Sequence, residues 1–316
     1  MKTARTWSVA LSGLDGTLVE VEADLSQQTP GFYLIGLPDK ALGEAVQRVF
    51  NACANSELPV PRRRLTVNLS PASLPKNGSG FDLAIAVAAL ATDGAIDAES
   101  ISRTVHLGEL GLDGRLRPVT GILPAVREAA RHDFTRVIVP RANEEEARLV
   151  SGIEVRAATS LAEVAQWHGA EVEVPEHDWV RAAEPGGVPR ATPGDLAEVV
   201  GQPEAVQALI VAAAGGHHLM LSGPPGAGKT MLATRLPTIL PPLDDNAALE
   251  VASVRSLSGE LVTRLEHTPP LEAPHHSAST AALVGGGSRV IRPGAIVRAH
   301  RGLLFLDELG AGKHTS

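Results

Sequence analysis

Cysteine and long apolar runs are scarce in this sequence of 316 residues. Its one cysteine, Cys53, cannot form a disulfide within the chain. Leu42, Val46 and Val49 precede it at helical spacing, so we expect Cys53 to be a small buried apolar side chain. The opening MKTARTWSVALSGLDG has no run typical of a signal peptide, and the longest apolar stretch, 82–91, is shorter than the ~20 residues that cross a bilayer. We therefore expect a cytoplasmic protein outside the membrane.

Basic charge is in deficit as well. The chain has 28 lysine and arginine residues against 36 aspartate and glutamate residues, a net charge of −8. This balance argues against a protein that coats nucleic acid through its overall charge, although a local basic patch is still possible. A chain of this length with 44% hydrophobic residues is expected to fold into two domains of ordinary size.

A change of composition divides the chain. Residues 169–195 are rich in proline, glycine and charge, which is typical of a linker. We expect one domain at 1–168 and a second at 196–316. Periodicity and β-branched content predict strands at 64–70, 104–110, 136–140 and 217–222, and helices at 39–54 and, around Pro203, at 196–216.

The segment after the last of these predicted strands is a candidate phosphate loop. GPPGAGKT fits G-x-x-x-x-G-K-[ST] and comprises Gly223, Pro224, Pro225, Gly226, Ala227, Gly228, Lys229 and Thr230. A predicted strand runs into it and an amphipathic helix that ends at Pro237 leaves it, as a loop that wraps phosphate with backbone N–H groups requires. We expect Lys229 to reach the β- and γ-phosphates of ATP and the Thr230 hydroxyl to bind Mg²⁺.

A second acidic motif follows about 80 residues later. The run LLFLDE at 303–308 predicts a buried parallel strand whose end places Asp307 beside the magnesium. Glu308 would then orient and polarise the attacking water. An adjacent pair of carboxylates favours a hydrolase over a passive nucleotide binder.

The stretch at 273–302, between these motifs, is basic. It contains Arg289, Arg292, Arg298 and Arg301, three histidines and no acid. Two interpretations stay open: a loop that contacts a polyanion, or a surface hairpin around the glycines at 285–287. Since His275 and His276 are adjacent, they would point to opposite sides of an extended segment, and we expect no metal there.

These motifs together resemble the ComM/YifB family of bacterial magnesium-chelatase-like AAA+ ATPases. The resemblance extends from about residue 6 to 309 and rests on the loop, on GLPDKALGEAVQRVF at 36–50, on LAEVVGQ at 196–202 and on RPGAIVRAHRGLLFLDEL at 292–309. It implies an α/β chain: an N-terminal Lon-protease-like α+β domain, then an AAA+ domain with a parallel sheet flanked by helices. It also implies hexameric rings, ATP hydrolysis coupled to branch migration of DNA, and an adenine pocket that includes Val199, Val200, Gly201 and Gln202.

The Lon-like resemblance raises the question of proteolysis. LPKNGSGFDLAIAVAAL at 74–90 resembles the Lon nucleophile segment, but the nucleophile position falls on Gly80, and Ser79 lies one residue early. Leu123 or Pro124 occupies the place of the partner lysine. A serine hydroxyl without an adjacent base is a weak nucleophile, so we expect a domain that is not a protease.

The last residues differ from the family. Members continue past FLDE to a polar sensor, an arginine finger and a helical lid, whereas this chain reads GAGKHTS and stops. A truncated or frame-altered product, slow in hydrolysis, is therefore expected, because an arginine finger supplies about 10³–10⁵ in rate. The leading hypothesis is a DNA motor subunit; the alternatives are a chelatase-like subunit for tetrapyrrole metallation and a nucleotide-binding scaffold without turnover.

Overall fold

The computed structural model describes residues 2–36, 43–74, 76, 78–176, 179–180, 194–275, 277–286 and 292–307. The chain divides into two compact units. The first unit is Met1–Pro185 with Gly259–Thr263, and the second is Gly186–Ser258 with Arg264–Ser316. The linker at 169–195 and the domain limits drawn from composition stay predictions, since much of the stretch between 177 and 193 lies outside the described residues.

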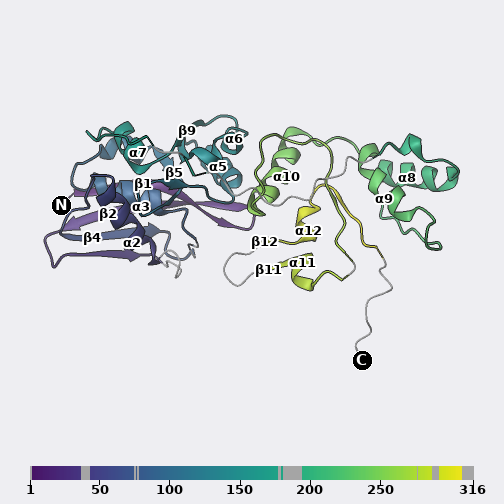
Figure 1. Cartoon of the computed structure of the whole chain (residues 1–316), viewed down its shortest axis with the longest axis horizontal. Coiled ribbons are helices and arrows are strands. Elements are labelled where there is room, and N and C mark those ends of the chain that lie inside the picture. The colour runs from purple at the N-terminus through teal and green to yellow at the C-terminus, as the bar shows by residue number, and fades with distance from the viewer. Residues whose placement is uncertain are drawn as a thin grey trace, which may run out of the picture. The chain divides into compact units, whose positions relative to one another are not determined.

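A mixed, mostly parallel sheet organises the first unit (Figure 1). Its seven strands lie in the order β3 (Gly31–Ile35), β4 (Arg64–Ser70), β2 (Asp15–Ser26), β1 (Lys2–Ser12), β5 (Thr104–His106), β8 (Arg136–Pro140) and β9 (Glu154–Ala158). β2 is antiparallel to both of its neighbours, and the other neighbouring pairs are parallel. Alternate residues of β2 from Val19 to Leu25 are buried, the period-2 pattern of a strand that covers a core with one face.

The helices of the first unit pack on this sheet. They are α2 (Ala45–Asn55), α3 (Asp82–Ala91), α4 (Ala98–Ser102), α5 (Ile122–Arg131), α6 (Glu144–Ala147) and α7 (Leu161–Trp167), with a 3₁₀ turn at Arg141–Asn143. All ten residues of α3 are buried, against β1, β2 and α2. The longest apolar run of the sequence is therefore a core helix. Among the described residues, no helix is both long enough and apolar enough to cross a bilayer.

The strands predicted at 64–70 and 136–140 are confirmed, and so is the burial of Cys53, whose thiol pKa burial raises to about 12. The single strand predicted at 104–110 is wrong. It is two strands, β5 and β6 (Glu109–Leu110), and β6 forms a small hairpin with β7 (Leu116–Arg117). The break lies at Gly108, because its N–H donates to the Gly80 carbonyl at 3.0 Å and its own carbonyl accepts from the Leu83 N–H at 3.1 Å.

The second unit consists mainly of short elements. They are α8 (Pro203–Gly215), α9 (Lys229–Arg235), α10 (Asp245–Leu257), β10 (Leu271–Glu272), α11 (Thr280–Val284), β11 (Gly285–Gly286), β12 (Arg292–Pro293), α12 (Ala295–Arg298) and β13 (Leu303–Leu304), with 3₁₀ turns at Leu196–Glu198 and Leu236–Ile239. β10 and β13 pair in parallel, and β11 and β12 form a hairpin. A small core of Leu196, Leu209, Ala213, Leu232 and Leu236 joins α8 to α9.

Three expectations for the second unit need correction. The helix predicted at 196–216 begins only at Pro203, since proline fits the first turn of a helix and the residue before it is driven out of the helical region. No strand forms at 217–222, because residues 218–222 have no backbone hydrogen-bonding partner among the described residues. The helix prediction at 39–54 is met by α2 from Ala45 onward, and residues 37–42 lie outside the described residues.

The predicted strand at 303–308 is shorter and more exposed than expected. β13 covers Leu303–Leu304 and is half-buried. Its one described partner is β10, which lies on one side only. A parallel strand is normally buried on both faces and paired on both edges, so the packing around β13 is incomplete in this unit.

A hydrogen-bonded pair of histidines is buried in the first unit. The Thr6 hydroxyl lies 3.0 Å from the Ile101 carbonyl and 2.8 Å from His106 Nδ1. His106 Nε2 lies 3.0 Å from His168 Nε2, and the Ser100 hydroxyl lies 2.7 Å from His168 Nδ1. One order of donors satisfies every hydrogen-bonding group with both rings neutral. The Ser100 hydroxyl donates to His168, and His168 donates to His106. His106 then donates to the Thr6 hydroxyl, which donates to the Ile101 carbonyl. A proton added to either ring would break this order.

Burial disfavours the charged form of both rings. It lowers the pKa of His168 from 6.5 to about 4, with Arg136 and Arg156 adding to the effect, and it lowers the pKa of His106 well below its usual value, with His168 adding to the effect. The unfolded chain therefore binds more protons than the folded chain as the pH falls from 6.5 toward 4. The stability that the neutral pair provides is complete above pH 6.5 and is lost toward pH 4.

We predict that a His168→Gln variant loses stability less steeply with falling pH than the parent. The difference in unfolding free energy between the two proteins should shrink by about 3 kcal/mol between pH 7 and pH 4, since one pKa unit is worth about 1.4 kcal/mol. Chemical denaturation followed by tryptophan fluorescence at several pH values measures it. Parallel pH profiles for the two proteins would contradict the prediction.

Candidate nucleotide-binding site

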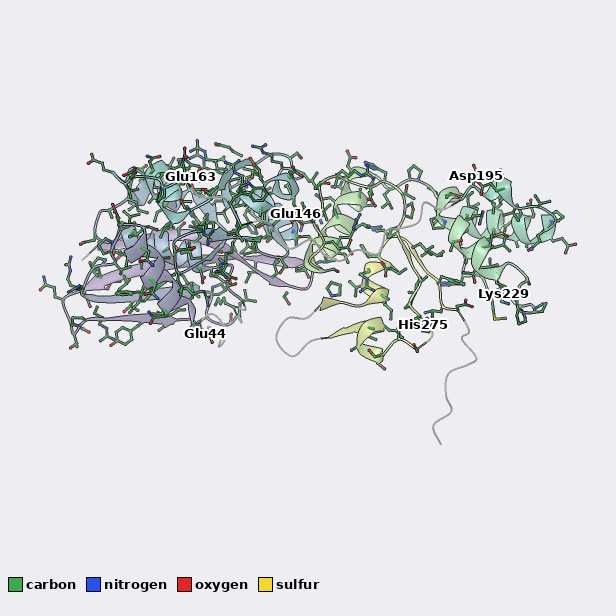
Figure 2. All side chains as sticks on the ribbon, viewed as in Figure 1. Glu44, Glu146, Glu163, Asp195, Lys229 and His275 are labelled. Atoms are coloured by element: carbon green, nitrogen blue, oxygen red, sulfur yellow. The ribbon has the colours of Figure 1, made fainter. Side chains whose placement is uncertain are left out.

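The loop at 223–230 joins the extended segment 217–222 to α9. Gly226 and Gly228 both have φ of +82°, a left-handed conformation that glycine adopts without strain. Lys229 begins α9 and folds back over the loop, where its Nζ donates to the carbonyls of Gly223 at 2.8 Å and Pro224 at 3.1 Å (Figure 2). The ammonium group is thus held at the mouth of the loop. A phosphate bound there would compete with these two carbonyls for the lysine.

The loop meets the end of β13. The Thr230 hydroxyl donates to Asp307 Oδ2 at 3.3 Å, across 77 positions of the sequence. A hydroxyl and a carboxylate are hard oxygen donors of the kind that Mg²⁺ binds, and Mg²⁺ usually takes only one or two protein ligands besides water and phosphate. The donor set therefore fits a magnesium nucleotide. No group of three or more histidine, cysteine or acidic side chains that could hold a metal occurs in the described part of the chain. Glu308 lies outside the described residues.

The segment predicted to line an adenine pocket is anchored to the loop. Gln202 Nε2 donates to the Ala227 carbonyl at 3.1 Å, and Val199 packs on the core between α8 and α9. Val200, in contrast, is 89% exposed, and Gly201 has φ of +80°. The structure thus brings Gln202 to the phosphate loop and leaves Val200 in solvent.

Arg235 was not singled out by its sequence context, yet it attaches this segment to α9. Its Nε donates to the Asp195 carbonyl at 3.1 Å, and its Nη2 pairs with Glu198 at 2.9 Å. Asp195 in turn accepts from the Ala197 N–H at 2.9 Å (Figure 2 labels Asp195). A single arginine at the end of a helix belongs to no recognisable sequence motif. Only its contacts show that it attaches residues 195–198 to α9.

Two arginines of the basic stretch pair with acids from elsewhere in the unit. Arg298 pairs with Glu272 at 3.1 Å. Arg301 at 3.0 Å and His300 at 3.1 Å both contact Glu250, and His300, followed by Arg301, lowers the pKa of this carboxyl. The charge count within 273–302 did not include Glu272 and Glu250, because both lie outside that stretch. Arg289 and the side chain of Arg292 lie outside the described residues.

The same stretch contains the expected hairpin, and contact with a polyanion stays a prediction. β11 and β12 pair antiparallel, with Gly285 opposite Pro293. His275 Nδ1 lies 2.7 Å from the Ser277 hydroxyl, and His276 lies outside the described residues.

In the first unit, Ser79 is paired with a carboxylate. Its hydroxyl donates to Glu109 Oε2. Leu123 and Pro124, at the position of the Lon lysine, are buried in α5. Lys76 is buried too, and its amine donates to the carbonyls of Gly36 and Pro71. The hydroxyl of Ser79 thus faces an acid in place of the amine that a Ser-Lys pair would need.

Comparison with known proteins identifies what the chain is similar to. Residues 21–143 match the family described as subunit ChlI of Mg-chelatase, and residues 195–315 match magnesium chelatase, subunit ChlI. These two matches, together with a weaker likeness to Lon proteases, place the chain in the magnesium-chelatase-like AAA+ class. A Lon protease of Mycolicibacterium smegmatis is 24% identical over 49% of this chain and 21% of its own length.

Within that class, several relatives, among them the three that follow, match nearly all of the chain. An uncharacterised protein of Mycobacterium tuberculosis is 50% identical over 98% of this chain and 61% of its own length. Competence protein ComM of Haemophilus influenzae is 42% identical over 98% and 60%, and uncharacterised protein YifB of Escherichia coli is 40% identical over 95% and 58%. The chain belongs to the ComM/YifB family, and it spans about three fifths of the length of these relatives.

We predict that Gly228→Ala disturbs the start of α9, whereas Gly223→Ala does not. An alanine at φ of +82° costs about 1–2 kcal/mol, and its Cβ would lie 3.3 Å from Gln202 Nε2 and Met231 Cε. A Cβ at Gly223 would make an ordinary contact with Ala227 at 3.4 Å. Hydrogen exchange of the α9 amides should therefore accelerate about tenfold in the first variant only. Equal rates in the two variants would show that the left-handed turn is not required.

Proposed function

We propose that this chain binds ATP with Mg²⁺ and acts as a subunit of an AAA+ motor that couples ATP hydrolysis to DNA remodelling, including branch migration, during natural transformation or recombination. The observation that carries the nucleotide part is the 3.3 Å contact between Thr230 and Asp307 at the mouth of the loop. The DNA part is supported by the likeness to competence protein ComM.

In this proposal the loop backbone from Gly223 to Gly228 surrounds the phosphates, and Lys229 moves from the two loop carbonyls onto the β- and γ-phosphates. Thr230 and Asp307 hold the Mg²⁺, which would neutralise charge on the phosphates when bound. Gln202 keeps the adenine-side segment against the loop. Glu308 has the role of orienting the attacking water. Assembly into a hexameric ring belongs to the same proposal and comes from the family resemblance.

We further propose that the chain hydrolyses ATP slowly when it acts alone. Asp307 follows a strand of two residues that is paired on one side, and the segment that leads into the loop has no strand partner among the described residues. Catalytic groups that are not held in position lose much of the advantage of preorganisation. Binding of ATP depends less than hydrolysis does on holding these catalytic groups in position.

A chelatase-like subunit that drives metal insertion into a tetrapyrrole is the second candidate. The two matched families, both described by the ChlI subunit of magnesium chelatase, favour it. A nucleotide-binding scaffold without turnover is the third candidate, and the one-sided pairing of β13 favours it. The Lon-like first unit and the similarity to ComM favour the DNA motor over both.

We predict that Lys229→Ala weakens binding of Mg-ATP by about 10- to 100-fold, because charge-assisted hydrogen bonds contribute about 1.5–3 kcal/mol each. Fluorescence titration with a labelled ATP analogue measures the affinity. Arg103→Ala is the matched control, since it removes one exposed positive charge from the first unit. Equal affinity of the Lys229 variant and the parent would remove the basis of the proposed nucleotide site.

The three candidate functions give different responses in an ATPase assay. For the DNA motor we expect single- or double-stranded DNA to raise the hydrolysis rate, and the Asp307→Asn variant to lose this response while it keeps its fold. Stimulation only by a porphyrin-binding partner would identify the chelatase-like subunit. Nucleotide binding with no turnover under either condition, in a protein extended to the full length of its relatives, would identify the scaffold.

A further inference from the structure

α9 joins two attachments that lie at its opposite ends. Lys229 and Thr230, at the phosphate loop, are its first residues, and Arg235 is its last. At a rise of about 1.5 Å per residue the helix is only about 10 Å long. A helix satisfies its own backbone and is stiff over that length, so a group fixed to Arg235 is also fixed relative to the loop. In Figure 2 Asp195, which contacts Arg235, lies apart from Lys229.

The guanidinium of Arg235 uses all three of its nitrogens. Nε donates to the Asp195 carbonyl at 3.1 Å, Nη2 to Glu198 Oε2 at 2.9 Å, and Nη1 to the Met231 carbonyl at 3.2 Å. The side chain is only 18% exposed. A planar guanidinium makes such bonds at once in fixed directions, which a lysine amine cannot do. We call Gly194, Asp195, Glu198 and Arg235 the clasp.

Gly194 lets the backbone pass close to the ion pair of the clasp. A Cβ there would lie 2.6 Å from Glu198 Oε2 and 2.7 Å from Arg235 Nη2, closer than non-bonded atoms approach. Both atoms are the ends of flexible side chains, so an alanine at 194 would push them apart and open the clasp without removing a charge. Glu198 is 59% exposed, and an exposed ion pair contributes little by itself. The bond from Arg235 to the backbone carbonyl therefore carries much of the attachment.

A second attachment holds the same segment at the phosphate loop. Gln202 Nε2 donates to the Ala227 carbonyl at 3.1 Å. Between the two attachments, Leu196 is buried in the core that joins α8 to α9. The two residues just before Gln202 remain open, because Val200 is 89% exposed and Gly201 has no side chain. An apolar side chain and a bare backbone, fixed beside a phosphate loop, suit the apolar face and the polar edge of a nucleobase.

We propose that Arg235 is a positioning residue for the nucleoside part of ATP: through the clasp it holds Val200 and Gly201 where they receive the base. This role rests on the proposed function, because it takes ATP as the ligand of the loop. With the clasp open, residues 194–201 must be ordered again when the nucleotide binds. The entropy lost in that ordering lowers the affinity for the nucleoside.

Binding of the phosphates does not depend on the clasp. Within the described part of the chain, the hydrogen bonds of the Arg235 side chain go to residues outside the loop at 223–230. The phosphates would meet the loop backbone, Lys229 and Thr230 at the other end of α9. An open clasp therefore lowers the affinity for ATP and leaves unchanged the affinity for inorganic tripolyphosphate, which has the three phosphates but no nucleoside.

The test compares Mg-ATP and Mg-tripolyphosphate by isothermal titration calorimetry on the whole chain. The parent should bind ATP more tightly than tripolyphosphate. Arg235→Ala should weaken ATP binding about tenfold, because it removes charged hydrogen bonds to residues 195–198, and should change tripolyphosphate binding less than about twofold. Arg235→Lys should lose nearly as much ATP affinity, since one amine cannot replace the guanidinium.

Gly194→Ala should have the same selective effect with no change of charge. Gly286→Ala is the matched control in the same unit, because a Cβ there would make only an ordinary contact, 3.7 Å from Ala281. Circular dichroism checks that each variant is folded. If Arg235→Ala is not folded, Gly194→Ala decides alone.

Three results overturn the role assigned to Arg235. The first is an unchanged ATP affinity in either clasp variant, Arg235→Ala or Gly194→Ala. The second is an equal loss of affinity for the two ligands, which would assign Arg235 to the stability of α9. The third is a parent that binds the two ligands equally well, since the nucleoside then contributes nothing. Failure of the proposed function looks different: the parent binds neither ligand, and the role of Arg235 falls with it.

Discussion

The contact between Thr230 and Asp307 is the constraint on which the candidate site depends. A hydrogen bond between exposed side chains contributes only about 1 kcal/mol, so it does not hold the loop and the strand end together by itself. The small core around Leu209 and Leu232 does this, because Leu303 of β13 and Leu221 before the loop both pack against it. A substitution in this core would therefore shift Thr230 relative to Asp307, although the residues of the loop stay the same.

The two units differ in how much of their apolar surface is buried. In the first unit α3 is buried along its whole length against a seven-stranded sheet, and its buried Asp82 pairs with Arg48 at 2.7 Å. Burial raises the pKa of Asp82 to about 6, while the bonds from Arg48 oppose that rise. In the second unit apolar side chains such as Met220 and Val211 remain in solvent. Large apolar side chains also reach solvent in the first unit, among them Ile35 and Phe50, but the most exposed of the described ones, Val200 and Met220, lie in the second.

Charge in the second unit shows how a local count misleads. The stretch 273–302 contains no acid, and its arginines alone predicted a polyanion patch as one of two possibilities. Glu272 and Glu250, which lie outside the stretch, pair with Arg298 and with Arg301. Such pairs are modest in energy when exposed, but they reduce the local potential that would attract DNA. The DNA-contacting surface of the proposed function is therefore to be sought beyond these two arginines.

The sequence by itself determined the features that depend on short-range chemistry. Glycine spacing around Gly226 and Gly228 favours the left-handed turns of the loop, and the β-branched runs at 64–70 and 136–140 specify strands. Only the tertiary structure decided which distant groups meet: Thr230 with Asp307, Arg235 with Glu198, and Gly108 with Gly80. It also decided that 217–222 forms no strand. The physical reason is that a helix satisfies its backbone within itself, whereas a strand and a binding site require partners from elsewhere in the chain.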